Sequence, residues 1–198
     1  MLVPSMTMKE IRKEIEKDFP SVIHHASVVQ VNLMKNHRQL FNRRIVHVGD
    51  MVSNQKNNWI YKIVLKRKLQ TTNFLAYYFN DIGLSAVEAT VGPYMLFFTT
   101  HFFKRYNERL KLNLVNPYDI LHHYMKWHSV YQFKTVKKIT ENLVEVFGVN
   151  EQGALLGTLD TELNFYKINT FITNEMLKGE QMEEEARIKA LMGKYMET

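Results

Sequence analysis

The chain has 198 residues, of which 45% are hydrophobic and 12% aromatic, and its formal net charge is +6. This length suits one large domain or two small ones, and the composition excludes a disordered chain and a coiled coil. No apolar run approaches the length of about 20 residues that a membrane span requires, and residues 1–5 lack the basic and apolar parts of a signal peptide. Because cysteine is absent, disulfides, thiolate metal sites and cysteine nucleophiles are excluded. We therefore expect a soluble, cytoplasmic protein that does not contact a membrane.

The basic charge is concentrated near the N-terminus. Residues 1–70 contain 13 Lys and Arg against 5 Asp and Glu, whereas residues 71–198 contain 13 against 15. A basic surface suits RNA, because neutralisation of phosphates supplies most of the affinity that does not depend on sequence. Many basic proteins bind no nucleic acid, so the charge leaves both RNA and a protein as candidate partners.

The N-terminal region is predicted to be helical. Thr7–Glu10 has the pattern of a capping box, and apolar residues at a spacing of four predict an amphipathic helix over residues 8–18 that ends before Pro20. A second helix is predicted over residues 21–41, although the β-branched residues in this range also fit a strand.

A polar loop over residues 49–58 marks a predicted boundary. It divides the chain into a helical segment, residues 1–55, and an α+β domain, residues 56–198. One continuous domain is the alternative.

Strands follow from residue 59, where apolar and polar residues alternate as in a half-buried antiparallel strand. Further strands are predicted over residues 73–80, 84–90 and 94–99, which form a meander of four, and over residues 143–149, 154–158 and 163–173. Helices are predicted over residues 101–111, 117–128 and 180–195. These elements predict an α+β fold in which antiparallel sheet packs with helices.

The helix over residues 101–111 concentrates polar side chains on one face. This face carries His101, Arg105, Glu108 and Arg109. A cap at Thr99 or Thr100 places the histidine at a strand-to-helix junction, where free backbone N–H groups favour an anion.

This set of residues suits a phosphodiester. Cleavage of RNA without a metal requires a base for the 2′-hydroxyl proton, cations for the developing charge and an acid for the leaving oxygen. We predict that His101 is a general acid or base and that Arg105 and Arg109 bind phosphate. Glu108 is predicted to orient an arginine or to act as a second proton carrier. The same spacings also fit ordinary ion pairs on a solvent-exposed helix face.

The spacing His-x-x-x-Arg-x-x-Glu-Arg, together with the segments Gly153–Gly157 and Lys167–Thr173, resembles the barnase, colicin D and RelE-like ribonucleases and toxin domains. The resemblance covers about residues 99–178. It implies a metal-independent enzyme in which helices pack on a small antiparallel sheet and a basic or histidine residue cooperates with polar residues on that sheet. By position it nominates Lys167, Thr170 and Thr173 as substrate-binding residues. The meander before residue 99 has no counterpart in this group.

A second candidate surface for nucleic acid lies on the first strand of the meander. Lys62, Lys66 and Lys68 are predicted to face solvent, with Arg67 nearby. The charges are interleaved with aromatic residues, a combination that binds single strands: Tyr61, Tyr77, Tyr78 and Phe79. The alternative is that these lysines protect a sheet edge from aggregation.

Other motifs predict neither a cofactor nor a metal. The chain lacks a glycine-rich phosphate loop and the Gly-x-Ser-x-Gly pattern of hydrolases. Asp119 and His123 offer two metal ligands from one helix face, but a third ligand is missing. The C-terminal helix has an apolar stripe that suits either its own domain or a dimer contact: Ile188, Leu191, Met192 and Tyr195.

Overall fold

The computed structural model describes residues 1–36, 44–66, 69–90, 92–127, 131–150, 152–179, 181–183, 185–187 and 190. The helices are α1 (Met8–Asn36), α2 (Thr100–Arg109) and α3 (Pro117–Trp127), and a short 3-10 helix η2 spans Asn174–Met176. The strands are β1 (Ile45–Val52), β2 (Asn58–Lys66), β3 (Leu69–Asn80), β4 (Gly83–Ala89), β5 (Met95–Phe98), β6 (Gln132–Lys138), β7 (Leu143–Val149), β8 (Gly153–Asp160) and β9 (Phe165–Thr173). The predicted α+β class is confirmed.

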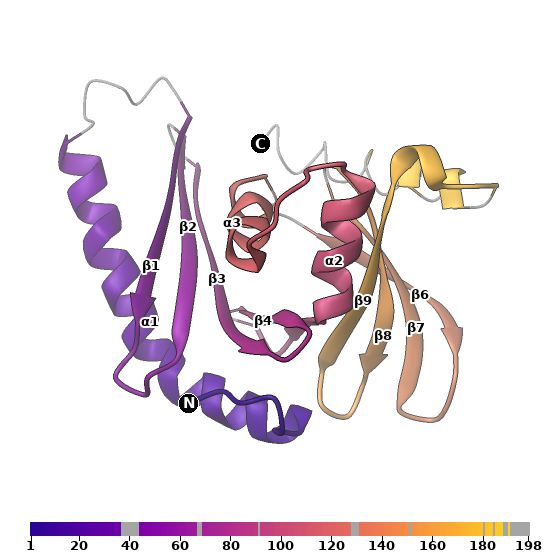
Figure 1. Cartoon of the computed structure of the whole chain (residues 1–198), viewed down its shortest axis with the longest axis horizontal. Helices are drawn as coiled ribbons and strands as arrows, with labels where there is room; N and C mark the ends of the chain where they lie inside the picture. The colour runs from indigo at the N-terminus through magenta and orange to yellow at the C-terminus, as the bar shows by residue number, and fades with distance from the viewer. Residues whose placement is uncertain are drawn as a thin grey trace.

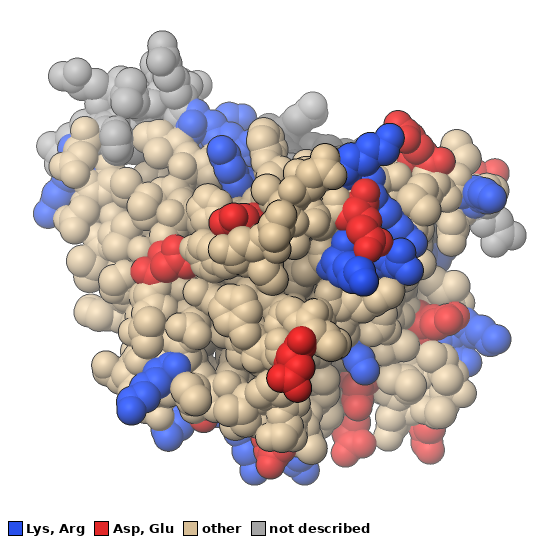
Figure 2. Space-filling view, viewed as in Figure 1, with Lys and Arg blue, Asp and Glu red and all other residues tan. Residues whose placement is uncertain are grey.

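The nine strands form one sheet in the order β1-β2-β3-β4-β5-β9-β8-β7-β6. Strands β1 to β5 make one antiparallel meander and β6 to β9 another, and the two join where β5 runs parallel to β9. Figure 1 shows the two meanders as diverging arms, with α2 and α3 between them and α1 along the first arm. On the face drawn in Figure 2, Lys and Arg side chains gather over α2, whereas α3 carries few charges.

Helix α1 replaces the two helices predicted in the N-terminal region. The capping box is confirmed, because the Thr7 amide donates to Glu10 Oε2 at 2.8 Å. Pro20 lies inside the helix rather than after its end. A proline in a helix interior costs about 3 kcal/mol. That cost is offset by an apolar stripe that continues across it and is buried against the sheet: Ile11, Ile15, Val22 and Ala26.

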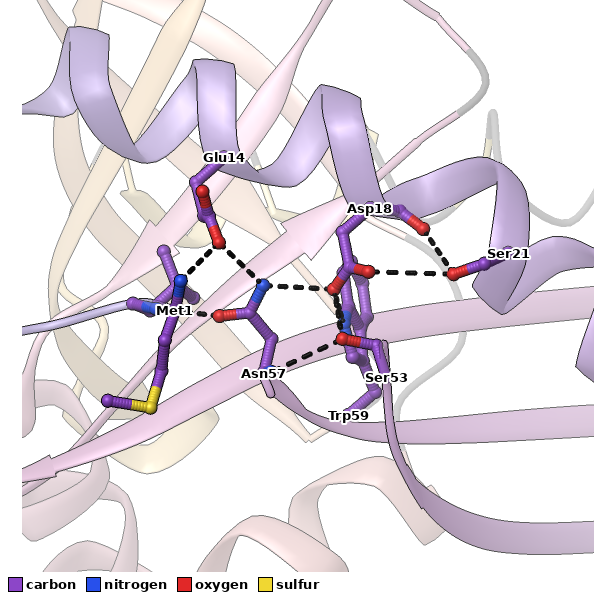
Figure 3. A network of polar contacts seen from close by, with 8 residues as sticks. Met1, Glu14, Asp18, Ser21, Ser53, Asn57 and Trp59 are labelled. Carbon is purple, nitrogen blue, oxygen red and sulfur yellow. Dashed lines mark hydrogen bonds and ion pairs between the residues drawn. The ribbon is translucent and has the colours of Figure 1, made fainter. Parts of the chain in front are cut away.

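A buried carboxylate fixes α1 to the turn between β1 and β2 (Figure 3). Asp18 Oδ2 accepts hydrogen bonds from Ser53 Oγ at 2.6 Å, from Asn57 Nδ2 at 2.9 Å and from Trp59 Nε1 at 2.8 Å. The predicted boundary at residue 55 therefore falls in a turn that is tied to the helix. Because β1 pairs with β2 along its whole length, residues 45–52 belong to the sheet and not to a helical segment.

Strand β2 is buried on both faces, so the prediction of a half-buried strand is wrong. The side chains of β2 pack against α1 on one face and in the cluster around α2 and α3 on the other. Lys62 is 0% exposed and cannot contact a nucleic acid, whereas Lys66 at the end of the strand is exposed. Arg67 and Lys68 lie outside the described residues. The alternating pattern missed the second covering layer, which comes from helices distant in sequence.

The predicted elements between residues 73 and 173 agree with the structure to within a few residues, and two strands were not predicted. Strand β1 was not predicted because its sequence contains a Gly-Asp pair typical of loops, and β6 was not predicted because it is a lysine-rich edge strand. Residues 181–183 and 185–187 are helical, and the apolar stripe predicted to pack on its own domain or to form a dimer contact lies outside the described residues. Within the described ranges, no helix is long and apolar enough to cross a membrane.

Candidate functional site

Helix α2 takes the place of a missing strand beside β9. Strand β5 pairs with β9 only as far as Phe98 and Ile168, but β9 continues to Thr173. Beyond this point α2 contacts β9 on one side and β4 on the other. The Thr99 amide donates to the Ile168 carbonyl at 3.2 Å, which holds the start of α2 against β9.

The N-terminus of α2 is capped as predicted. Thr99 Oγ1 accepts a hydrogen bond from the Phe102 amide at 3.2 Å. Because Thr99 lies between β5 and α2, His101 stands at a strand-to-helix junction, and its side chain is exposed. The opposite face of the helix buries Phe102, Phe103 and Tyr106, so the predicted division into an apolar and a polar face is confirmed.

The polar face carries four side chains, which we call the α2 stripe: His101, Arg105, Glu108 and Arg109. The first three are connected to one another. Arg105 Nε donates to His101 Nε2 at 3.4 Å, and Arg105 Nη1 pairs with Glu108 Oε2 at 2.9 Å. Both side chains of this ion pair are 42% exposed, so the pair adds little to stability. Figure 2 shows the basic and acidic groups gathered over α2.

Arg109 joins the α2 stripe to the sheet. Its Nη1 atom donates to Thr170 Oγ1 at 3.2 Å and to the Phe171 carbonyl oxygen. Burial lowers the pKa of Arg109, the charge of Arg105 lowers it further, and Glu108 raises it. The residue predicted to bind phosphate thus also donates a hydrogen bond to the backbone of β9, at the edge that β5 leaves unpaired.

An open groove with a volume of about 770 Å³ lies over the second meander. Its polar lining comes from β6 to β9 and from the segment after β9: Lys134, Thr135, Glu145, Thr158, Asn169, Thr170, Gln181 and Glu183. Register places Lys134, Phe147, Leu156 and Thr170 in one row across the four strands. The next row contains Lys137, Glu145, Thr158 and Lys167. Residues opposite each other in register share a face, so both rows face the groove side.

A β-bulge shapes the sheet under this groove. Leu156 pairs with Thr170 and Gly157 pairs with Ile168, which leaves Asn169 as an extra residue in β9. A Cβ atom at Gly157 would lie 2.1 Å from the Lys167 carbonyl oxygen, so only glycine allows this close approach of the two strands. Bulges re-aim side chains and occur next to functional sites, and here Asn169 lines the groove.

The structure brings some predicted site residues together and separates others. Thr170 lines the groove and receives the Arg109 hydrogen bond. Lys167 is exposed and lies opposite Thr158, whereas Thr173 is half-buried at the far end of β9, opposite Gly153.

The groove lining among the described residues contains neither His101 nor Arg105. Lys62 and Lys66 belong to the other meander. Sequence reasoning missed several groove residues: Lys134, Glu145, Thr158, Asn169, Gln181 and Glu183. A glycine inside a strand often marks a bulge, and Gly157 was the available signal for this part of the site.

His123 of α3 is bound to a buried tyrosine of α2. His123 Nδ1 and Tyr106 Oη form a hydrogen bond of 2.9 Å, and Tyr106 Oη donates to Gln152 Oε1 at 3.1 Å. Burial lowers the pKa of His123, and the charges of Lys126 and His122 lower it further. Within the part of the chain that the structure describes, no group of three acidic or histidine side chains is arranged to hold a metal ion.

Comparisons with protein-family models, with curated proteins and with solved structures found no match to this chain. The interpretation of the site therefore depends on the geometry of the α2 stripe and the groove.

Proposed function

We propose that this chain binds RNA and cleaves its phosphodiester bonds without a metal ion, at the border between the α2 stripe and the groove. The observation that carries the proposal is the contact between Arg109 and Thr170, since it joins a cationic helix face to a polar groove. Helices packed on antiparallel strands are also the arrangement that the resemblance to metal-independent ribonucleases implies.

Each group of the α2 stripe has a role in this reaction. His101 accepts the proton of the ribose 2′-hydroxyl and returns it to the 5′-oxygen as that oxygen leaves. The 2′-oxygen attacks phosphorus, which yields a 2′,3′-cyclic phosphate and a free 5′-hydroxyl. Arg105 and Arg109 stabilise the negative charge that develops on the phosphate oxygens. Glu108 orients Arg105 through their ion pair.

The exposure of His101 favours a second candidate, a non-catalytic interaction domain. Its side chain is exposed and lies outside the groove lining among the described residues. An α2 stripe of this kind would hold the phosphates of RNA, or the acidic groups of a protein partner, without cleavage.

The decisive experiment is cleavage of a mixed-sequence RNA by the purified chain in the presence of a chelator. We expect products that end in a cyclic phosphate, and we expect His101→Ala to lower the rate about 100-fold or more. His24→Ala on the exposed side of α1 is the matched control and should cleave as the wild type does. Binding without cleavage would support the second candidate, and the absence of both binding and cleavage would refute the RNA proposal.

A further inference from the structure

The charge of the groove differs from that of the α2 stripe. Among its described lining residues, Lys134 is the one cation, whereas Glu145 and Glu183 are anions. Lys137 and Lys167 stand on the same face of the sheet, opposite lining residues but outside the described lining itself. A phosphate site needs a surplus of positive charge and N–H donors, and the lining itself does not supply it. The groove is suited to a neutral group that presents hydrogen-bond donors to carboxylates.

We propose that the groove binds an RNA base that carries an exocyclic amino group, with Glu145 and Glu183 as acceptors for its N–H groups. The proposal rests on the proposed function, because it assigns the phosphate to the α2 stripe and the base of the same RNA to the groove. It names a substrate preference that the α2 stripe alone does not provide.

The lining has both parts that a base site requires. Its floor contains the apolar side chains of Phe147 and Leu156, which suit the flat face of a base. Hydroxyl and amide groups on Thr158 and Asn169 stand among them and offer further donors and acceptors. The volume of about 770 Å³ lies within the range of about 300–1,000 Å³ found for sites of small molecules.

The groove lies on the face of the sheet opposite to α2, because Leu156 and Thr170 line it whereas the alternate residues Leu155 and Phe171 pack in the cluster under α2 and α3. The two sites meet at the edge of β9, where Thr170 accepts a hydrogen bond from Arg109 of the α2 stripe at 3.2 Å. A nucleotide whose base enters the groove therefore reaches the helix around this edge, where Arg109 can contact its phosphate. Single-stranded RNA meets this requirement, because its unstacked bases can turn into a protein pocket and expose their edges.

Carboxylates discriminate between bases because an ionised carboxylate only accepts hydrogen bonds. Adenine, cytosine and guanine present amino groups, whereas uracil has carbonyl oxygens on both sides of its single ring N–H. A carboxylate facing such an oxygen is repelled, and a good base contact changes affinity by about tenfold or more. We therefore expect uridine to bind least tightly.

A purely structural role for the acidic residues predicts that they do not affect the preference among bases. Glu145 lies directly opposite Lys137 of β6, and such cross-strand pairs of opposite charge stabilise sheets. If this pairing is the whole role of Glu145, its replacement leaves the relative affinities of the four bases unchanged.

The test uses free nucleosides, which carry no phosphate and therefore do not depend on the α2 stripe. Adenosine, cytidine, guanosine and uridine are titrated into the full chain, and binding is followed by NMR. We expect uridine to bind about tenfold more weakly than the other three. Glu145→Gln and Glu183→Gln should each reduce this preference, whereas Glu141→Gln in the exposed turn before β7 should leave it unchanged.

Equal binding of all four nucleosides by the wild type would overturn the base site, and that measurement needs no variant to fold. An unchanged preference in both groove variants would overturn it as well. Discrimination between nucleosides without any RNA cleavage would keep the base site and remove the proposed catalysis. Cleavage of RNA without any preference among the bases would keep the proposed catalysis and remove the base site.

Discussion

The two meanders of the sheet are covered differently. Strand β2 of the first meander is buried along almost its whole length, between α1 on one face and the α2–α3 layer on the other. Strand β6 of the second meander is exposed over most of its length, and the groove opens on one face of β6 to β9. The first meander therefore acts as scaffold, and the second leaves side chains exposed along an open groove. Substitutions of buried residues in the first should change stability, and, if the groove binds RNA as proposed, substitutions of groove-lining side chains in the second should change binding.

The largest effect is expected at Asp18, which anchors α1 to the first meander. Replacement by alanine removes an acceptor that three donors share, and Ser53 Oγ and Trp59 Nε1 lose their partner while Asn57 Nδ2 keeps Glu14. Each buried unsatisfied group costs about 1–3 kcal/mol. We expect Asp18→Ala to lower the free energy of unfolding by about 4 kcal/mol, measured by urea denaturation. Asp81→Ala in the β3–β4 turn is the control and should change it by less than about 0.5 kcal/mol. A loss at Asp18 as small as that of the control would show that α1 is not held by this carboxylate.

The next effect concerns pH and the buried Glu88 of β4. Burial raises the pKa of Glu88 to about 7, although hydrogen bonds from Asn73 and Tyr131 and the charge of Lys62 oppose this rise. Its folded-state pKa lies above the unfolded value of 4.5, so its contribution to stability is complete below about pH 4.5 and is lost as the pH rises through 7. We expect a loss of up to about 3 kcal/mol across this window.

Denaturation at several pH values measures this loss. Glu88→Gln keeps the side chain neutral and should flatten the profile between pH 5 and 8. The exposed Glu141→Gln is the control and should retain the slope. A profile in Glu88→Gln that is as steep as in the wild type would assign the slope to another group.

How far the sequence predicted this molecule depends on whether the cause of each feature is local. The α2 stripe was predicted because its spacing and its cap at Thr99 are properties of one helix. The burial of Lys62 was not predicted, because α3 covers β2 from a position distant in sequence. The helix through Pro20 was missed for the same reason, since the sheet supplies the apolar contacts that outweigh the local penalty.

The groove was missed for a related reason. Its lining comes from four strands and the segment that follows them, and their register depends on a bulge at Asn169. A single sequence shows which residues alternate along a strand, but not which residues of different strands stand opposite each other. Thr170 was nominated through a family resemblance, and its contact with Arg109 became visible only in the structure.

A moderate effect is expected at Gly157, beneath the groove. Alanine there would bring Cβ to 2.1 Å from the Lys167 carbonyl oxygen, so β8 and β9 must move apart. We expect Gly157→Ala to destabilise the chain by about 2 kcal/mol and to weaken RNA binding. Gly92→Ala is the matched control, because the nearest atom to its added Cβ lies 3.7 Å away. If both variants unfold at the same temperature, the bulge tolerates a side chain and does not define the groove.

The smallest effect is a change in RNA affinity, and it compares one lysine from each meander directly. Lys66 and Lys167 are both exposed lysines of sheet strands and were both predicted to bind substrate, but Lys66 ends a strand of the scaffold and Lys167 lies beside the groove. If RNA lies across the second meander, Lys167→Ala removes one phosphate contact and should weaken affinity about fivefold at low salt, with a shallower dependence on salt. Lys66→Ala has the same change in net charge and should leave affinity within about twofold of the wild type. Equal losses would mean that RNA responds to net charge alone, because a general electrostatic attraction does not distinguish the two positions.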